Sequence, residues 1–174
     1  MILRSDHSDH DPAAGPAPSA EAGPDQPNTP RLNLLLSYGG WRQGSVVDQL
    51  PRLLEPMGIH SIRVHCGREA AEAIQREHIH IAMVDLDIPL DREQSQTTPA
   101  GSRVLQLLRR LNQPPPTVVV RPPQVGPRDS ARSLSEALRE GAFAVLDRPL
   151  ELETTLEVMR RVLRRHYADN WPAA

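Results

Sequence analysis

Residues 79–89 read Ile-His-Ile-Ala-Met-Val-Asp-Leu-Asp-Ile-Pro, and this stretch decides the fold. Its first six residues are apolar apart from His80, as in a parallel strand that is covered on both faces. We expect His80 to be half-buried and hydrogen-bonded rather than to bind a ligand. The run ends at Asp85, and Asp87 and Pro89 follow closely. Because open parallel sheets bind ligands at the carboxyl ends of their strands, Asp85 is the first candidate functional residue.

Strand-like and helix-like segments alternate on both sides of this stretch. Short apolar runs predict strands at residues 32–36, 62–66, 79–84, 117–120 and 142–146. Apolar residues at helical spacing predict helices at residues 46–57, 69–78, 101–111 and 130–140, and a last helix after Pro149. Five such units with right-handed crossovers predict an α/β fold, in which a five-stranded parallel sheet lies between two layers of helices.

The helical spacing also predicts which side chains are buried. It places Leu53 and Met57 on the inner face of the first helix, and Leu134, Ala137 and Leu138 on the inner face of the fourth. The only cysteine, Cys66, falls in the second predicted strand, where we expect a small buried hydrophobic side chain rather than a nucleophile.

Composition divides the chain into one domain and two tails. Residues 1–30 are rich in proline, alanine and polar residues without a periodic apolar face, which predicts a disordered tail. Residues 31–167 carry the predicted strands and helices and form the expected domain, and residues 168–174 form a short C-terminal tail.

Charge and cysteine content exclude several classes of function. The formal net charge is -2, and the 20 basic residues are all arginines, so no concentrated basic surface indicates nucleic-acid binding. One cysteine excludes an internal disulfide and fits a reducing compartment. No apolar run is long enough for a membrane span, and the first residues lack the apolar core of a signal peptide. We therefore expect a cytoplasmic protein with no membrane or nucleic-acid partner.

Several residues occur in the order and at the places that bacterial response-regulator receivers use. Asp85 ends the third predicted strand and Pro89 follows four residues later, Gly101 precedes the third helix, residues 140–142 form the turn before the fifth strand, and Arg148-Pro149 stands where receivers have Lys-Pro. Across residues 31–167 the chain resembles a receiver domain, which implies a (βα)₅ flavodoxin-like fold.

The resemblance implies that Asp85 is the residue that accepts phosphate. Receivers also bind Mg²⁺ through an acidic pair after the first strand, but here that position reads Ser37-Tyr38 and supplies no anionic ligand. Only Asp85 and Asp87 remain as metal ligands, and Asp87 is expected to be a solvated loop carboxylate. We therefore expect weak or no Mg²⁺ binding and no other cofactor.

Two arginines replace other conserved groups of the receiver pattern. Arg121 stands where receivers have a hydroxyl residue, Arg148 replaces their lysine, and Val145 occupies their aromatic position. This exchange is expected to invert the charge around Asp85. Because guanidinium groups stay charged, they disfavour a divalent cation nearby. One hypothesis is that Arg121 or Arg148 pairs permanently with Asp85 and locks the domain as a pseudo-receiver. The alternative is that Arg121 points into solvent and only Arg148 lies near Asp85 and Pro149.

These observations favour a non-enzymatic signalling module of a two-component or phosphorelay system. It would bind a kinase, a regulator or its own copy through the last helix and adjacent elements, with impaired or absent phosphorylation. One alternative is a phosphorylatable single-domain response regulator with Asp85 as acceptor. A second is a small flavodoxin-like ligand-binding protein or enzyme, although neither a Walker-type loop nor a GxGxxG motif after the first strand is present.

Overall fold

The computed structural model describes residues 32–38, 46–92, 99–123 and 126–167. The two predicted tails, residues 1–30 and 168–174, lie outside this part of the chain. Five parallel strands form one sheet in the order β2-β1-β3-β4-β5, which confirms the predicted fold class. The strands are β1 (Leu32–Ser37), β2 (Ile59–Val64), β3 (Ile81–Asp85), β4 (Thr117–Arg121) and β5 (Ala144–Asp147).

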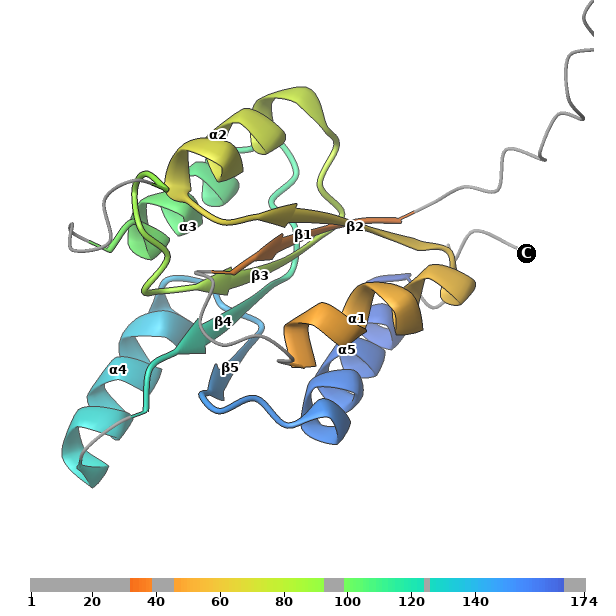
Figure 1. Cartoon of the computed structure of the whole chain (residues 1–174). Coiled ribbons are helices and arrows are strands. Elements are labelled where there is room, and N and C mark those ends of the chain that lie inside the picture. Colours follow the sequence, from red (N-terminus) through yellow and green to blue (C-terminus); the bar gives the residue numbers. More distant parts are fainter. Residues whose placement is uncertain (1–31, 39–45, 93–98, 124–125, 168–174) are drawn as a thin grey trace, which may run out of the picture.

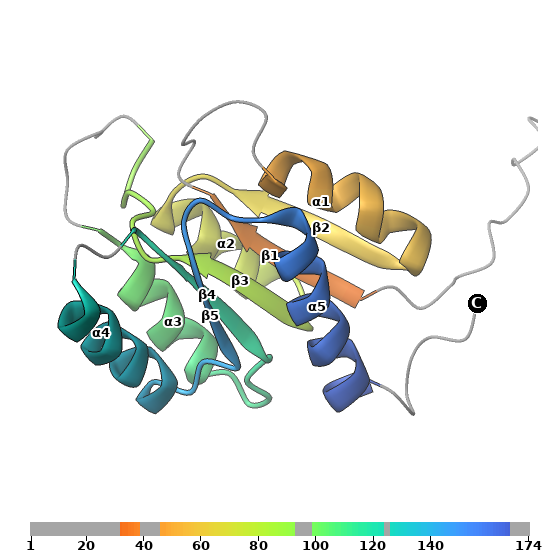
Figure 2. The same cartoon turned by 90° about the horizontal axis from the view of Figure 1, so that it is seen from below.

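The helices cover both faces of the sheet. In Figure 1, α1 and α5 lie below the sheet and α2 and α3 lie above it, and Figure 2 shows the face with α1 and α5. The first helix is α1 (Val46–Leu54), which is followed by the 3₁₀ turn η1 (Glu55–Met57). The other helices are α2 (Gly67–Arg76), α3 (Gly101–Arg109), α4 (Pro127–Arg139) and α5 (Leu152–Tyr167). No described helix combines the length and the apolar character needed to cross a membrane.

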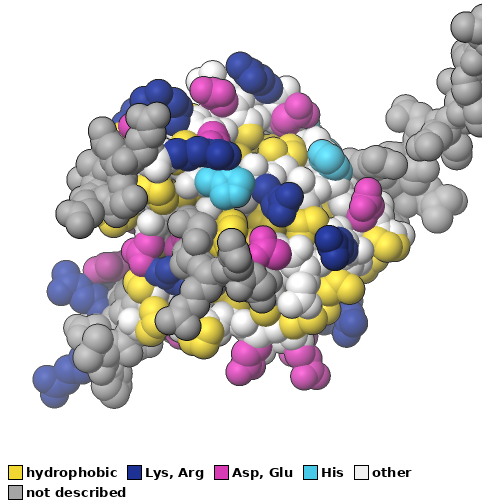
Figure 3. Space-filling model, in the orientation of Figure 1, with side chains coloured by type: hydrophobic (Ala, Val, Ile, Leu, Met, Phe, Trp, Pro, Cys, Tyr) yellow, Lys and Arg dark blue, Asp and Glu magenta, His cyan; other side chains and the backbone are white. Residues whose placement is uncertain are grey.

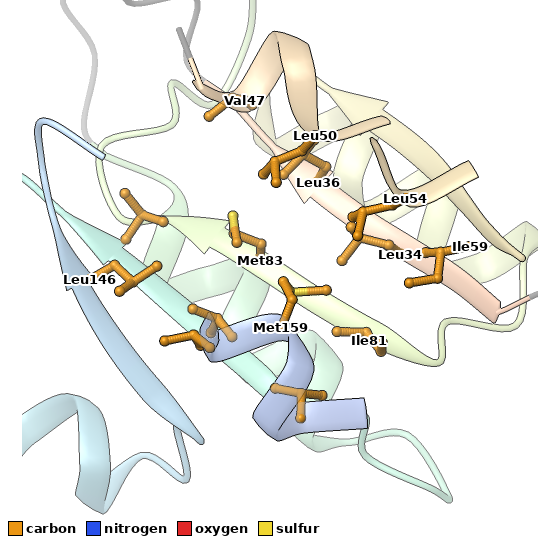
Figure 4. Close-up of a cluster of buried hydrophobic side chains, with 14 of the residues drawn as sticks. Leu34, Leu36, Val47, Leu50, Leu54, Ile59, Ile81, Met83, Leu146 and Met159 are labelled. Atoms are coloured by element: carbon orange, nitrogen blue, oxygen red, sulfur yellow. The ribbon is translucent and has the colours of Figure 1, made fainter. Parts of the chain in front are cut away.

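Each strand contributes to two hydrophobic cores because successive side chains point to opposite faces of the sheet. Leu34 and Leu36 of β1 pack with α1 and α5, as Figure 4 shows. Leu35 between them packs on the other face with residues of α2 and α3. Met83 and Val84 of β3 divide in the same way. A continuous apolar run is thus what a strand between two helical layers requires.

Four side chains predicted to be inward on helices are exposed. The buried residues of α1 are Val47, Leu50 and Leu54, so Leu53 lies at the flank of this face and is 43% exposed. Met57 is 45% exposed, because the α-helix gives way to the 3₁₀ turn η1, which has fewer residues per turn and rotates Met57 off the buried face. In α4 the small side chain of Ala137 faces the core, so Leu134 and Leu138 are 39% and 49% exposed.

Strand boundaries also differ from the predicted ones, most of all in β2. β2 begins at Ile59 and ends at Val64, earlier in the chain than the predicted 62–66. Cys66 therefore lies outside the strand, directly before α2, with an extended backbone. Its side chain is nevertheless buried, as expected for a small hydrophobic residue. Strand ends are hard to predict here because polar residues such as His60 and Arg63 interrupt the apolar pattern of an edge strand.

At the amino ends of the strands, His80 joins three elements. Its Nδ1 accepts the backbone N–H of Asn33 at 3.0 Å, and its carbonyl accepts the hydroxyl of Tyr167 at the end of α5. The residue is half-buried, so the expectation of a satisfied histidine is confirmed. Burial and, to a lesser degree, the neighbouring His78 lower the pKa of His80. The fold therefore favours the neutral imidazole.

Acidification is expected to destabilise the domain through His80. The pKa of His80 in the folded protein lies below its ordinary value of 6.5, so the unfolded chain takes up a proton at a higher pH than the folded one. The free energy of unfolding therefore falls as the pH falls below 6.5. The free energy of unfolding, measured with urea at about pH 7.5 and about pH 5.5, should fall less in His80→Asn, whose amide oxygen also accepts the Asn33 N–H. An equal loss in both proteins would contradict this role.

The start of α3 lies directly against the end of β3. A Cβ atom on Gly101 would lie 2.4 Å from the Cα and 2.6 Å from the carbonyl oxygen of Leu86. Backbone atoms cannot give way as a flexible side chain can, so only glycine fits here. This close approach fixes where the turn after Asp85 runs and explains why the sequence has glycine at this point.

We expect Gly101→Ala to destabilise the domain by about 1–3 kcal/mol, because the added methyl group forces α3 away from β3. Urea unfolding measures the change. The matched control is Ser102→Ala on the exposed side of the same turn, which should stay within about 0.5 kcal/mol of the parent. A Gly101→Ala protein as stable as the control would show that the helix shifts without cost.

Candidate functional site

Polar residues gather where the three strands β3, β4 and β5 end. Asp85 is the last residue of β3, Arg121 of β4 and Asp147 of β5, and Arg148 follows Asp147 directly. Because the strands are parallel and in register, these ends meet at the same edge of the sheet. Asp87 lies in the turn after β3. This carboxyl edge is the candidate site.

Asp85 is fully buried at the centre of this edge, with 0% of its surface exposed. Its backbone N–H donates to the Ser37 hydroxyl at 2.7 Å. Its Oδ1 accepts the backbone N–H of Asp87 at 3.0 Å. The carboxylate thus stabilises the turn that follows it, as aspartate side chains commonly do in turns. A phosphate acceptor, in contrast, has to expose its oxygens to the phosphate donor.

Ser37 and Tyr38 occupy the place where receivers are expected to carry acidic residues. Both are buried, at 3% and 8% exposure, and the Ser37 hydroxyl receives the N–H of Asp85. The backbone N–H of Tyr38 donates to the Val64 carbonyl at 2.8 Å and extends the pairing of β1 with β2. The position therefore holds two neutral side chains that belong to the packed interior.

Arg148 and Asp87 form an ion pair that joins β5 to the turn after β3. The Arg148 side chain is only 15% exposed, while that of Asp87 is 42% exposed. Asp87 is thus an exposed loop carboxylate, as expected, but it also pairs with Arg148, which was not expected. The N–H of Asp87 binds Asp85 and its carboxylate binds Arg148, so a short chain of contacts leads from Asp85 to Arg148. The peptide bond between Arg148 and Pro149 is cis.

Arg121 and Asp147 form a second ion pair across the ends of β4 and β5. Nε of Arg121 donates to Oδ1 of Asp147, and Nη2 donates to Oδ2 at 3.2 Å. The Arg121 side chain is 4% exposed, whereas that of Asp147 is 53% exposed. The alternative in which Arg121 points into solvent is therefore wrong. A guanidinium this deeply buried requires its two-point contact with a carboxylate.

Asp147 was not among the predicted residues of this edge, and it changes the expected charge of the site. Among the described residues of this edge, the carboxylates of Asp87 and Asp147 pair with the two guanidinium groups, and the buried Asp85 adds a third carboxylate. The expected inversion of charge is therefore wrong. A direct pair of Arg121 or Arg148 with Asp85 remains a prediction. The sequence signal that could have found this residue is the acidic Asp147 beside Arg148. Asp147 is in register with Arg121 on the adjacent strand.

A third group of charges lies beyond the end of β2. Glu69 of α2 accepts the backbone N–H of His65 at 2.9 Å and pairs with Arg92 of the loop after β3. Burial raises the pKa of Glu69, but the hydrogen bonds from Arg92 and His65 outweigh it and lower the pKa overall. These contacts hold the loop after β3 against α2.

Ligand-binding features are few in the part of the chain that the structure describes. No three His, Cys, Asp or Glu side chains gather there as metal ligands. A hollow of about 310 Å³ lies beside the second ion pair and is lined by Asp147, Arg148, Pro149, Glu151 and Thr154 together with apolar neighbours. Larger hollows lie elsewhere, between α2 and α3 and at the amino edge.

Known structures share the fold of this chain, although no protein-family profile and no curated protein sequence matches it. A CheY-like response-regulator receiver domain protein from Methanospirillum hungatei JF-1 superimposes with a TM-score of 0.60 at 17% identity, over 80% of this chain and 99% of that one. The chain has a receiver fold. The receiver domain of the Francisella response regulator 1452 matches with a TM-score of 0.55 at 16% identity, over 78% and 98% of the two chains.

The same fold also occurs in a solved structure that is not named as a receiver. A protein named adenylate cyclase from Rhodopirellula baltica matches with a TM-score of 0.58 at 18% identity, over 79% of this chain and 91% of that one. At such identities the likeness shows the fold alone, and one fold hosts many functions. The function of this chain therefore depends on the residues at its carboxyl edge rather than on the fold.

Removal of Asp147 is expected to destabilise the protein by about 1–3 kcal/mol, because it leaves the Arg121 guanidinium buried without its bidentate partner. Urea unfolding of Asp147→Ala measures this loss. The double variant Arg121→Met/Asp147→Ala should recover most of it, since the buried guanidinium that lost its partner is then absent as well. If the double variant is less stable than Asp147→Ala, the ion pair is not the cause of the loss.

Proposed function

We propose that this chain is a receiver-like signalling module that acts by binding another protein, without Mg²⁺-dependent phosphorylation of Asp85. The observation that supports this proposal most directly is the series of contacts at the carboxyl edge. Asp85 is 0% exposed and accepts the N–H of Asp87, and the Asp87 carboxylate in turn pairs with Arg148. The groups that a receiver would offer to metal and phosphate are thus engaged with one another.

The chemistry of phosphoryl transfer supports this proposal. The incoming phosphoryl oxygens need a divalent cation, which is usually held by carboxylates together with carbonyl and water oxygens. Here Ser37 and Tyr38 offer no carboxylate, and Asp87 already holds a guanidinium. A cation at this place would have to displace Arg148 from Asp87 while the Arg148 charge stayed nearby. The residues present do not fit a bound Mg²⁺.

The same contacts suggest what the module does instead. The pairs Arg148–Asp87 and Arg121–Asp147 hold β4, β5 and the turn after β3 in one arrangement. In this proposal the domain is a non-catalytic partner that presents a constant surface. The partner is a kinase, a regulator or a second copy of the chain, and the contact includes α5 and neighbouring elements.

One observation favours a second candidate, a phosphorylatable response regulator. Asp85 ends the central strand of a receiver fold, where the phosphate acceptor of that family is expected. If the turn after β3 opened, the Asp85 carboxylate would lose the Asp87 N–H and gain access to solvent. The two candidates differ in whether a phosphate donor modifies Asp85.

Incubation with acetyl phosphate and Mg²⁺ should leave Asp85 unmodified, because its carboxylate is buried and no acidic pair holds the cation. Intact-protein mass spectrometry measures the added phosphate, and a response regulator with the full acidic set serves as the positive control. Asp85→Asn is the matched control for modification elsewhere. Phosphate on the parent that is absent from Asp85→Asn would overturn the proposal in favour of the second candidate.

A further inference from the structure

A groove runs along the outer side of the two helices α2 and α3. It consists of a hollow of about 400 Å³ near the carboxyl ends of the strands and a hollow of about 530 Å³ near their amino ends. Gln75 of α2 lines both hollows, so they join at this residue. Apolar side chains from both helices line them, among them Ala71, Ile74, Leu107 and Leu111. We name the two hollows together the α2–α3 groove.

Backbone contacts fix the carboxyl end of the α2–α3 groove. At the start of α2 the N–H of Gly67 donates to the Pro89 carbonyl at 2.8 Å. Just before α3 the N–H of Ala100 donates to the Ile88 carbonyl at 2.8 Å. Both helices are thus attached to the loop that follows β3. A groove held in this way exists before a partner arrives, so binding costs little free energy for ordering it.

The α3 rim of the groove carries two arginines that lack a partner in the described part of the chain. Arg103, Leu107 and Arg110 follow one another at intervals of four and three residues, which places them on one side of the helix. Both arginines are exposed, α3 contains no acidic residue, and neither arginine forms an ion pair with a described residue. The helix dipole favours Arg110 at the end of α3 but disfavours a cation such as Arg103 in the first turn. The helix itself therefore does not account for Arg103.

The α2 rim of the groove has a different charge pattern. In Figure 3, basic and acidic side chains alternate over α2 at the top of the molecule. Arg76 lies 4.0 Å from Glu72 of the same helix, and Arg68 pairs with Asp91 of the loop after β3 at 2.8 Å. Among the described residues, the arginines of this rim thus have carboxylate partners, whereas Arg103 on the opposite rim does not.

We propose that the α2–α3 groove binds an amphipathic helix of a partner protein. The helix sets apolar side chains between α2 and α3 and acidic side chains against Arg103 and Arg110. An extended peptide fits less well, because no strand edge lines the groove and the peptide's own N–H and C=O groups would stay unpaired where it covers apolar side chains. A helix bonds these groups internally and offers one apolar side, as helices in grooves do.

The dimensions of the groove specify this helix further. The groove follows α2, whose 10 residues extend over about 15 Å, so about ten residues of a partner helix lie in it. Arg103 and Arg110 are two helical turns apart, or about 10 Å along α3. Two acidic residues seven positions apart on a helix that lies along the groove reach both arginines, and an apolar residue between them meets Leu107.

The groove lies on the face of the sheet opposite α5, and Figure 1 shows no described element over α2 and α3. It is therefore open to a partner. The inference rests on the proposed function in one respect, that the chain acts by binding another protein. To that function it adds a second contact surface and the kind of segment that this surface takes.

A synthetic helix tests the groove directly. The probe is a lactam-bridged peptide of about 15 residues, since shorter unbridged helices are marginal in water. It carries leucines along one side and two glutamates seven positions apart beside them. Fluorescence anisotropy of the labelled probe, with the full chain from about 1 μM to about 1 mM, covers the range of weak association. The parent should bind, and Arg103→Glu/Arg110→Glu should weaken binding about tenfold or more, because repulsion replaces two attractions.

Exchange of charge on the probe completes the test. A probe with lysines in place of its two glutamates should bind the double variant better than the parent. The matched control is Arg109→Glu, which makes the same change of charge on an exposed residue of α3 that lines a different hollow, towards α4. It should bind the first probe like the parent. If the double variant does not fold, as judged by far-UV circular dichroism, Arg103→Gln should still weaken binding about threefold.

Two results would overturn the inference. One is a parent protein that does not bind the first probe over the whole range. The other is binding that Arg109→Glu weakens as much as the changes at Arg103 and Arg110 do, because the contact then lies outside the groove. Neither result bears on the acetyl phosphate experiment, which needs no peptide. Failure of the groove is thus separable from failure of the proposed function.

Discussion

Charged groups that are removed from water must meet an opposite charge or a hydrogen-bond donor, and this requirement shapes the carboxyl edge of the sheet. Asp85 and Arg121 are 0% and 3% exposed. Asp85 meets the N–H of Asp87, and Arg121 meets Asp147. Because these partners belong to the turn after β3 and to the end of β5, satisfying the two buried charges also fixes the surrounding backbone.

The same requirement bears on whether the edge can act as a switch. A ligand or a modification shifts an equilibrium only by the difference in its affinity for two states. Where Arg148 already pairs with Asp87, an incoming anion has to compete with an internal carboxylate for the same guanidinium. An edge whose charges satisfy one another responds weakly to such an anion, which agrees with a proposed role in which the surface stays constant.

The fold could be predicted from the sequence because its strongest signals are local. The apolar run that ends at Asp85 predicted the central strand, and Gly101 was correctly placed at the start of the third helix. The exposure of Leu134 and Leu138 could not be predicted in this way. Helical spacing shows which residues share a face, but it was the position of Ala137 against the sheet that decided which face is buried.

The site was harder to predict, since a comparison with the receiver pattern shows what is missing at each position but not what compensates for it. Ser37, Tyr38, Arg121 and Arg148 were recognised as departures, and the edge was expected to be rich in positive charge. The balance came from Asp147, which has no role in that pattern and lies opposite Arg121 on the neighbouring strand. A buried charge that replaces a neutral residue requires a new partner nearby. The partner is best sought among residues in register on adjacent strands, because their side chains emerge side by side on one face of the sheet.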